Sequence, residues 1–333
     1  MELTDEGLVA GTGVLSRWVR LPSGVRAHYA TAGESGPAVV LLHGGIAGSS
    51  GLAGWRSMAA FLGANGFRVY CPDMPAFGLT EDPEGFYRPG QIGHLDFLHD
   101  FTTALCLDRF HLAGNSMGCQ NAVNYLLAHP ERVERFALVA GSVGDIVPPE
   151  AVAARDLRPA SERPSVRAFD GTAESMRRMM AAIVRRPEEL SDELIAMRTA
   201  AAVRNREAYQ RHTAATLDAA ERARLSTAGR LDKVDVPGIC LYGMQDVLIS
   251  AEARGYLQED ALPRVQFFYP DDCGHQGQTD QPEMFQQVFV EFFRDGRVSA
   301  QTAAWAGVST RRPPNPELVA PGKDGHAALQ AAH

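Results

Sequence analysis

Hydrophobic and polar positions along this chain predict an alternation of strands and helices. Short runs of apolar, often β-branched residues predict eight strands, at 14–21, 25–31, 39–42, 67–71, 109–113, 135–139, 238–242 and 265–269. Longer stretches with helical spacing lie between the later strands, at 56–64, 92–105 and 284–293. The first two strands flank a Pro-Ser-Gly turn and predict an antiparallel hairpin. Strands that are separated by helices predict a mostly parallel sheet with helices on both faces, which is the α/β class.

Between residues 145 and 231 the pattern changes, because strand-like runs disappear. The segment is rich in Ala, Arg, Glu and Met, with helical spacing at 173–184 and 191–214. We expect an inserted helical cap (lid) over the strand ends, which would exclude water and shape a pocket. The expected organisation is therefore a core of residues 1–144 and 232–297, a cap of residues 145–231, and a loosely ordered tail of residues 298–333 whose sequence is rich in Ala, Gly and Pro.

A Gly-x-Ser-x-Gly pattern at residues 114–118 follows the strand at 109–113 and precedes a helix-compatible stretch at 119–128. This strand–turn–helix context is typical of a nucleophile elbow, in which a tight turn exposes the serine hydroxyl at the carboxyl end of a sheet. Gly114 and Gly118 leave room for the neighbouring strand and helix. The pattern predicts that Ser116 is a nucleophile. The alternative is a glycine- and serine-rich turn without chemistry.

A serine hydroxyl is a poor nucleophile unless a base takes its proton and an acid orients that base. Asp246 follows the apolar strand at 238–242, and His275 follows the strand at 265–269. Serine, acid and histidine thus each lie just after a strand, in that order along the chain. We expect a catalytic triad of Ser116, Asp246 and His275. The alternatives are an ordinary turn aspartate and an exposed loop histidine.

The glycine-rich turn after the strand at 39–42 is the candidate oxyanion hole. It reads His43-Gly44-Gly45-Ile46-Ala47-Gly48. Serine hydrolysis forms an oxyanion that needs preorganised backbone N–H donors. We expect Gly45 and Ile46 to supply one donor and Met117, the residue after the nucleophile, to supply another. A phosphate-binding loop is the weaker alternative, because no Gly-Lys-Ser/Thr or Gly-x-Gly-x-x-Gly pattern follows the strand.

Composition restricts the partners. The 333 residues are 45% hydrophobic with a net charge of −8, which argues against nucleic acid or an anionic membrane as a partner. No apolar run is long enough to span a bilayer, and the first residues lack the features of a signal peptide. Five scattered cysteines without a C-x-x-C pair predict a reduced, cytoplasmic setting. We expect a small-molecule substrate, no metal and no cofactor.

From about residue 24 to residue 293 the chain resembles the α/β-hydrolase superfamily, and within it the meta-cleavage-product hydrolases, which hydrolyse C–C bonds in aromatic and steroid ring degradation. The resemblance rests on the elbow at 114–118 with its asparagine, the Cys-Gly-His run at 273–275, and the cap segment at 190–198. It implies the α/β-hydrolase fold and a role for Arg198 in binding the carboxylate end of the substrate. Gly44, Ser57, Asn115 and Gln276 are the other candidate substrate-binding residues.

Three positions depart from the family's pattern. The turn at 43–48 has Ile46 and Ala47 where the family has glycine and proline. The tryptophan that usually follows the catalytic histidine is Gln276, and the asparagine expected shortly after Trp55 is Ser57. The last two positions line the substrate pocket in the family. They therefore leave open an esterase or lactonase that uses the same triad in a pocket of different polarity.

Two further alternatives come from other classes. A non-catalytic ligand sensor on a hydrolase scaffold would carry a damaged triad, whereas all three residues are present here. A cofactor-independent dioxygenase on this fold would be recognised by oxygen consumption with substrate. Relatives of this family are often homo-oligomers, which implies self-association of this chain.

Overall fold

The computed structural model describes residues 13–156 and 169–321, so residues 1–12, 157–168 and 322–333 lie outside the described part. At its centre is an eight-stranded sheet with the order β1-β2-β4-β3-β5-β6-β7-β8. β2 pairs antiparallel with β1 and β4, and all other neighbours pair in parallel, which confirms the predicted sheet. The strands are β1 (Leu15–Arg20), β2 (Arg26–Ala32), β3 (Ala38–Leu42), β4 (Arg68–Pro72), β5 (Phe110–Asn115), β6 (Val133–Val139), β7 (Gly238–Leu241) and β8 (Gln266–Phe268).

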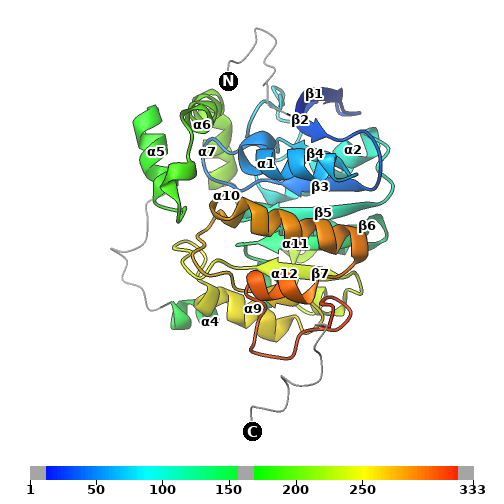
Figure 1. The fold of residues 1–333 in the computed structure, drawn as a ribbon. Coiled ribbons are helices and arrows are strands. Elements are labelled where there is room, and N and C mark those ends of the chain that lie inside the picture. The colour runs from blue at the N-terminus through cyan, green and yellow to red at the C-terminus, as the bar shows by residue number, and fades with distance from the viewer. Residues whose placement is uncertain (1–12, 157–168, 322–333) are drawn as a thin grey trace.

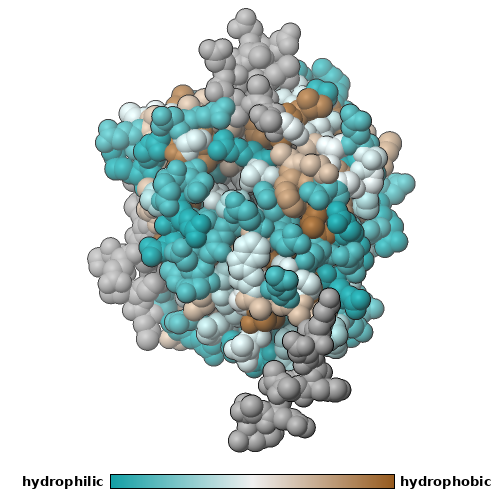
Figure 2. Space-filling model, in the orientation of Figure 1, coloured by the Kyte–Doolittle hydropathy of each residue, from teal (hydrophilic) through white to brown (hydrophobic). Residues whose placement is uncertain are grey.

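Helices cover both faces of the sheet, and the front layer is seen in Figure 1. One face packs against α1 (Gly51–Ala64), α11 (Pro282–Asp295) and α12 (Ala300–Trp305), and the other against α2 (Gln91–Ala104) and α3 (Met117–Ala128). β3 and β5 are buried along their whole length, because a parallel strand between two helix layers has no solvent-facing side. Figure 2 shows a mostly hydrophilic surface with small, separate hydrophobic patches. Among the described residues, no helix is both long and apolar enough to cross a membrane.

The segment between β6 and β7 is helical where the structure describes it. Its helices are α4 (Pro149–Arg155), α5 (Ala173–Ala181), α6 (Asp192–Arg204), α7 (Arg206–Ala214) and α8 (Ala219–Leu225). α5, α6 and α7 form a group on one side of the sheet, whereas α4 lies apart from them beside α9 (Tyr256–Ala261) (Figure 1). The helices α5 and α6 begin where Thr172 and Ser191 accept a hydrogen bond from a first-turn N–H, the usual role of these residues at a helix start.

Buried methionine and isoleucine side chains attach α5 and α6 to the core. Met176 and Met180 from α5 and Ile195 from α6 form one apolar cluster with Ile46 and Ala53. Ile46 lies in the turn after β3 and Ala53 in the first turn of α1. The inserted helices α5 and α6 therefore pack on the turn after β3 and on the first turn of α1.

Residues 298–321 differ from the loosely attached tail that their composition predicts. They form α12 and a short bridge between Val298 and Val319, and they bury Val298, Ala303 and Leu318. Arg311 also pairs with the buried carboxylate of Glu259 at 3.1 Å. A few well-spaced apolar residues attach this segment, although Ala, Gly and Pro dominate its composition. The remainder of the predicted tail, 322–333, lies outside the described residues.

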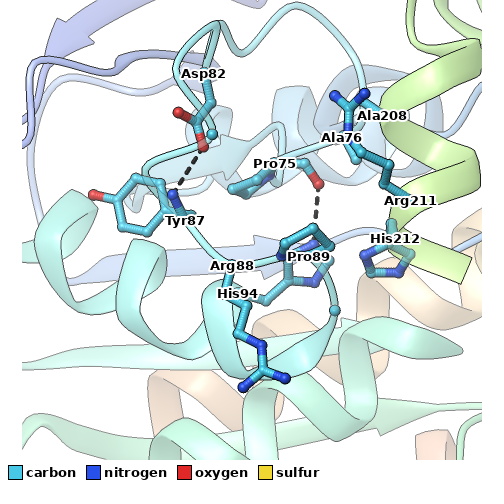
Figure 3. Close-up of a pocket in the computed structure, with 12 residues that line it drawn as sticks. Pro75, Ala76, Asp82, Tyr87, Arg88, Pro89, His94, Ala208, Arg211 and His212 are labelled. Atoms are coloured by element: carbon cyan, nitrogen blue, oxygen red, sulfur yellow. Dashed lines mark hydrogen bonds between the residues drawn. The ribbon is translucent and has the colours of Figure 1, made fainter. Parts of the chain in front are cut away.

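Two histidines join the cap to the core beside a small cavity of about 60 Å³ (Figure 3). The rings of His94 on α2 and His212 on α7 stack with centroids 4.7 Å apart. His94 Nε2 lies 3.0 Å from the Pro75 carbonyl oxygen, and Asn121 Nδ2 lies 3.1 Å from His94 Nδ1, so the neutral ring is fully hydrogen-bonded. Burial lowers the pKa of His94 to about 3 and that of His212 to about 4.

These two pKa values predict acid lability. A histidine with a depressed pKa in the folded state takes up its proton preferentially in the unfolded state, so stability is retained above pH 6.5 and falls as the pH drops toward 4. We expect each histidine to contribute a loss of roughly 3 kcal/mol in the free energy of unfolding across that range. Urea unfolding at pH 7 and pH 4 measures this loss, and a further measurement at pH 5 should show about 2 kcal/mol of it for each histidine. The His212→Phe variant should retain the ring contact and show a smaller loss, and an unchanged pH dependence in that variant would contradict the assignment.

Candidate active site

Ser116 lies between β5 and α3 in a strained turn. Its φ of 56° and ψ of −118° are rare for a residue with a side chain. A Cβ atom on Gly114 would lie 2.2 Å from the backbone of Gly118, and one on Gly118 would lie 2.2 Å from the carbonyl oxygen of Leu42. Only glycine fits at either position. The turn therefore has the conformation and the close packing of a nucleophile elbow.

Asp246 and His275 lie in the loops after β7 and β8 and form a buried pair. His275 Nδ1 lies 2.8 Å from Asp246 Oδ2, and the other carboxylate oxygen accepts the N–H groups of Leu248 and Ile249. Because a carboxylate only accepts, Nδ1 carries the proton and Nε2 presents a lone pair. Nε2 is buried and has no hydrogen-bond partner among the described residues. The ring is thus oriented as a base with a free acceptor.

Asn115 connects the serine turn to the histidine loop. Its side-chain amide donates to the carbonyl oxygens of Val139 and His275, each at 3.1 Å. Asn115 is 2% exposed, so its amide is committed to the backbone. In the sheet, β6 and β7 lie between β5 and β8. The Asn115 side chain therefore connects the carboxyl end of β5 to the loop that follows β8. The structure therefore supports local hydrogen bonding for Asn115, the alternative to substrate binding.

The turn after β3 packs directly on the serine turn. A Cβ atom on Gly44 would lie 3.4 Å from the Cβ of Ser116, and one on Gly45 would lie 2.9 Å from the sulfur of Met117. Within 13–156 and 169–321, no acceptor is recorded for the N–H of Gly45 or Ile46. Met117 is the first residue of α3, so its N–H group has no hydrogen-bond acceptor inside the helix. Gly44 and Gly45 thus pack against Ser116 and Met117, and Ile46 is the next residue of the same turn.

Tyr209 brings the cap into contact with this turn. Its hydroxyl donates to the carbonyl oxygen of Gly45 at 3.2 Å from helix α7. Holding the carbonyl of Gly45 fixes the orientation of the peptide that carries the next N–H, which belongs to Ile46. Sequence patterns do not indicate this contact, because a single tyrosine in a helical segment has many possible roles.

Arg198 is a buried cation at the edge of the site. It is 1% exposed, and burial lowers its pKa to about 10. Its Nη1 donates to Ser49 Oγ at 3.4 Å, whereas Nε has no partner, and no carboxylate of the described residues forms an ion pair with it. A Cβ atom on Gly48 would lie 2.2 Å from the Arg198 carbonyl oxygen. Helix α6 therefore places this arginine against the glycine-rich turn.

Gln276 and Gln278 add unsatisfied acceptors beside His275. They are 4% and 3% exposed, and the side-chain oxygen of each is buried without a hydrogen-bond partner in the described structure. The Gln278 amide donates to the carbonyl oxygen of Gly54 at 3.3 Å. Gln278 was missed in the sequence, although its position three residues after the histidine at a helix start could have indicated it. Such orphaned oxygens are suited to a ligand that carries hydrogen-bond donors.

Ser57 is not part of this site, so its assignment to the pocket is wrong. It is exposed on α1, and its carbonyl accepts a hydrogen bond from Gln286 of α11. The adjacent Trp55 is fully buried and packs against Phe289. α1 begins at Gly51, capped by Ser50, and this start directs Trp55 inward and Ser57 outward. In the described part of the chain, no group of three or more His, Cys, Asp or Glu side chains could hold a metal ion.

Comparisons with known proteins identify the family and the fold. Residues 37–282 match a family model described as the alpha/beta hydrolase fold. A 2-hydroxy-6-oxononadienedioate/2-hydroxy-6-oxononatrienedioate hydrolase from Paraburkholderia phymatum is 28% identical over 83% of this chain and 95% of that protein. A 2-hydroxy-6-oxo-6-(2'-aminophenyl)hexa-2,4-dienoic acid hydrolase from Metapseudomonas resinovorans is 30% identical over 81% of this chain and 88% of that protein. A meta-cleavage product hydrolase from Pseudomonas fluorescens IP01 shares the fold, with a TM-score of 0.69, 23% identity and coverage of 84% and 98%.

Proposed function

The chain belongs to the α/β-hydrolase family, and from that premise we propose that it hydrolyses a C–C bond in a ring-fission product with an acidic end. The observation that carries the proposal is Arg198, a buried cation without a carboxylate partner in the described residues. A buried charge is costly unless a counter-charge compensates it, and a substrate carboxylate would supply that charge. The two relatives named above are hydrolases of such acids by their names.

The proposed triad is Ser116, His275 and Asp246. His275 Nε2 accepts the serine proton while Ser116 attacks the substrate carbonyl carbon, and Asp246 stabilises the imidazolium through Nδ1. The N–H groups of Ile46 and Met117 hold the resulting oxyanion. The C–C bond then breaks, and its electron pair leaves with the dienoate fragment, which takes a proton from His275. Water deprotonated by His275 hydrolyses the acyl-enzyme and regenerates the serine.

Before the bond can break, the substrate's dienol must become a ketone. In that change the hydroxyl loses its proton, the far carbon of the diene gains one, and the double bonds shift. The electron pair of the breaking C–C bond is then conjugated with the new ketone and is stabilised as a dienolate. The unpartnered oxygens of Gln276 and Gln278 are suited to the hydroxyl group of the dienol, because each can accept its proton in a hydrogen bond. We propose that they help to position the substrate for this first step.

A second candidate function is hydrolysis of an ester or lactone by the same triad. Gln276 and Gln278 favour it, because two buried amides make a more polar pocket than an aromatic side chain would. In that reaction His275 protonates an alkoxide instead of a carbanion equivalent. The oxyanion donors and the nucleophile keep the same roles.

A panel of substrates separates the two functions. We expect the purified protein to bleach coloured ring-fission dienoates with a kcat/KM at least about 100-fold above that for short esters and lactones, because Arg198 recognises the acid. The matched control is the methyl ester of the same dienoate, which removes the negative charge but keeps the chromophore. Turnover of esters or lactones alone would leave the triad in place and reject the C–C reaction.

We also propose a reduced, cytoplasmic setting and self-association. All five cysteines are free, and four of them are buried, which suits a protein that does not depend on disulfides. Light scattering after gel filtration tests the self-association. A monomer over the micromolar range would reject it.

A further inference from the structure

Asp280 is a buried carboxylate that the proposed reaction does not use. It ends the short helix α10 (Gly277–Asp280) and is fully buried. One of its oxygens, Oδ1, accepts the N–H groups of Arg185 and Arg186 at 2.8 and 3.0 Å. The other, Oδ2, accepts the N–H of Gly274 at 2.7 Å. A single side chain thus joins the cap segment after α5 to the residue that precedes His275.

A second contact ties the same two segments together. The N–H of His275 donates to the carbonyl oxygen of Ile183 at 2.9 Å. A Cβ atom on Gly274 would lie 2.9 Å from that oxygen, so a larger residue there would push the two segments apart. The backbone of His275 is therefore held from the cap side by Ile183 and, through Gly274, by Asp280.

The exposed ion pairs nearby do not explain this attachment. Arg185 and Arg186 pair with Asp272 at 3.0 and 3.1 Å, but these side chains are 40% to 56% exposed. Exposed ion pairs contribute little to the free energy of folding, because water screens the charges and the long side chains lose conformational entropy. The three backbone N–H groups donate instead to the buried carboxylate of Asp280. Hydrogen bonds to a charged acceptor are stronger than neutral ones, and leaving the carboxylate without donors is costly.

We infer that Asp280 is a positioning residue that aligns His275 with Ser116 by locking the cap segment 183–186 against the histidine loop. The inference rests on the proposed function, in which His275 is the base. Asp280 does not contact the imidazole, whose Nδ1 is occupied by Asp246. Asp280 acts through the backbone of Gly274. The orientation of His275 therefore depends on the contact between Asp280 and residues 183–186.

The charge of Asp280 adds an effect that a purely structural role would not have. The acidic and basic side chains around the histidine loop are Asp246, Asp271, Asp272, Asp280, Arg185 and Arg186, and three of the carboxylates act on the adjacent Cys273 thiol. Burial raises the pKa of the Asp280 carboxyl, while its N–H donors oppose that rise. A nearby negative charge favours the imidazolium form of a histidine. Loss of this charge should therefore be visible in the pH dependence of kcat/KM.

The test is Asp280→Asn, which keeps the shape but presents an NH₂ group to at least one N–H donor. We expect kcat on the best dienoate or ester to fall about 30-fold with KM within about threefold, because alignment is lost and binding is not. The acidic limb of the kcat/KM profile should move to lower pH by roughly half a unit or more. Amide hydrogen exchange should become at least about tenfold faster in 183–186 and in 273–275.

Asp145→Asn is the matched control. Asp145 accepts the N–H groups of Thr227 and Ala228 at 2.6 and 3.0 Å and so ties the other end of the inserted segment. It has no contact with the histidine loop in the described structure. We expect it to alter stability while kcat and the pH profile stay at wild-type values. Equal changes in kcat and in the pH profile of both variants would show that Asp280 contributes only to the stability of the fold. That result would overturn the inference.

The remaining outcomes also decide the question. If Asp280→Asn keeps the wild-type kcat, pH profile and exchange rates, the inference is wrong. If Asp280→Asn does not fold, Asp280→Glu replaces it, because glutamate keeps the negative charge but displaces it. We expect this variant to have a lower kcat and an unchanged pH profile. A wild-type kcat in Asp280→Glu would overturn the inference. If the wild-type protein shows no Ser116-dependent turnover, the proposed function fails. Hydrogen exchange in 183–186 and 273–275 then still tests whether Asp280 holds these two segments together.

Discussion

Replacement of Ser116 by alanine is expected to lower kcat/KM for every true substrate by roughly 10⁴-fold or more. The reason is that His275 Nε2, a buried acceptor without a partner in the described residues, would have no hydroxyl to deprotonate. Binding should persist, because Arg198 and the turn after β3 are untouched. The measurement is steady-state turnover together with a titration of the inactive variant with a dienoate.

A matched variant separates chemistry from folding. Ser116 has a φ of 56°, so Ser116→Gly should relieve backbone strain and raise the free energy of unfolding by about 1 kcal/mol relative to Ser116→Ala. Both variants should be inactive. Residual activity within tenfold of wild type in either one would remove Ser116 from the role of nucleophile. If both variants are inactive although Ser116→Gly is the more stable, the loss of activity is chemical and not a consequence of unfolding.

Replacement of Arg198 by methionine is expected to stabilise the protein and to abolish its preference for acidic substrates. Burial lowers the pKa of Arg198 to about 10, a shift that corresponds to a cost of roughly 3 kcal/mol for keeping the charge buried. Methionine fills a similar volume without a charge, so we expect the free energy of unfolding to rise by about 1 to 3 kcal/mol. For acidic substrates, kcat/KM should fall at least about 100-fold.

The control for this variant is Arg177→Met. Arg177 lies on α5, where its partners are the carbonyl oxygen of Leu190 and the exposed carboxylate of Asp192. Its loss should leave stability within about 0.5 kcal/mol and turnover unchanged. Equal effects of Arg198→Met on a dienoate and on its methyl ester would show that Arg198 does not recognise the carboxylate. A lower melting temperature would show that the cation is already compensated in the free protein.

The sheet could be predicted from the sequence because its signals are local, and signals of the same kind led to the proposed triad. β3 and β5 are continuous apolar runs, and burial on both faces produces that pattern wherever a parallel strand lies between helix layers. Ser116, Asp246 and His275 each follow a strand within a few residues. Parallel strands bring their carboxyl ends to one edge of the sheet, so this spacing in sequence implies proximity in space.

The parts that could not be predicted depend on contacts between distant segments. Asp280 and its donors Arg185 and Arg186 lie about 95 residues apart, and nothing in either segment indicates the partner. Ser57 was misplaced because the start of α1 sets which face of the helix is buried, and the expected start at 56 concealed the cap formed by Ser50. The packing of Val298 and Val319 was missed because composition describes a segment on average, whereas two or three apolar side chains suffice to attach it.

The C-terminal segment sets a limit on how this protein can be shortened. The span shared with the hydrolase family ends at residue 282, which is the first residue of α11. A chain trimmed to that span would lose α11 and would expose the face of α1 on which Phe289 meets Trp55. Trimming at 297 would retain α11 but remove the Arg311 guanidinium that neutralises the buried Glu259 carboxylate. The folding unit of this hydrolase therefore extends beyond the span of the family model, and we expect a stable truncation to retain the residues through Val319, which is buried and bridges to Val298.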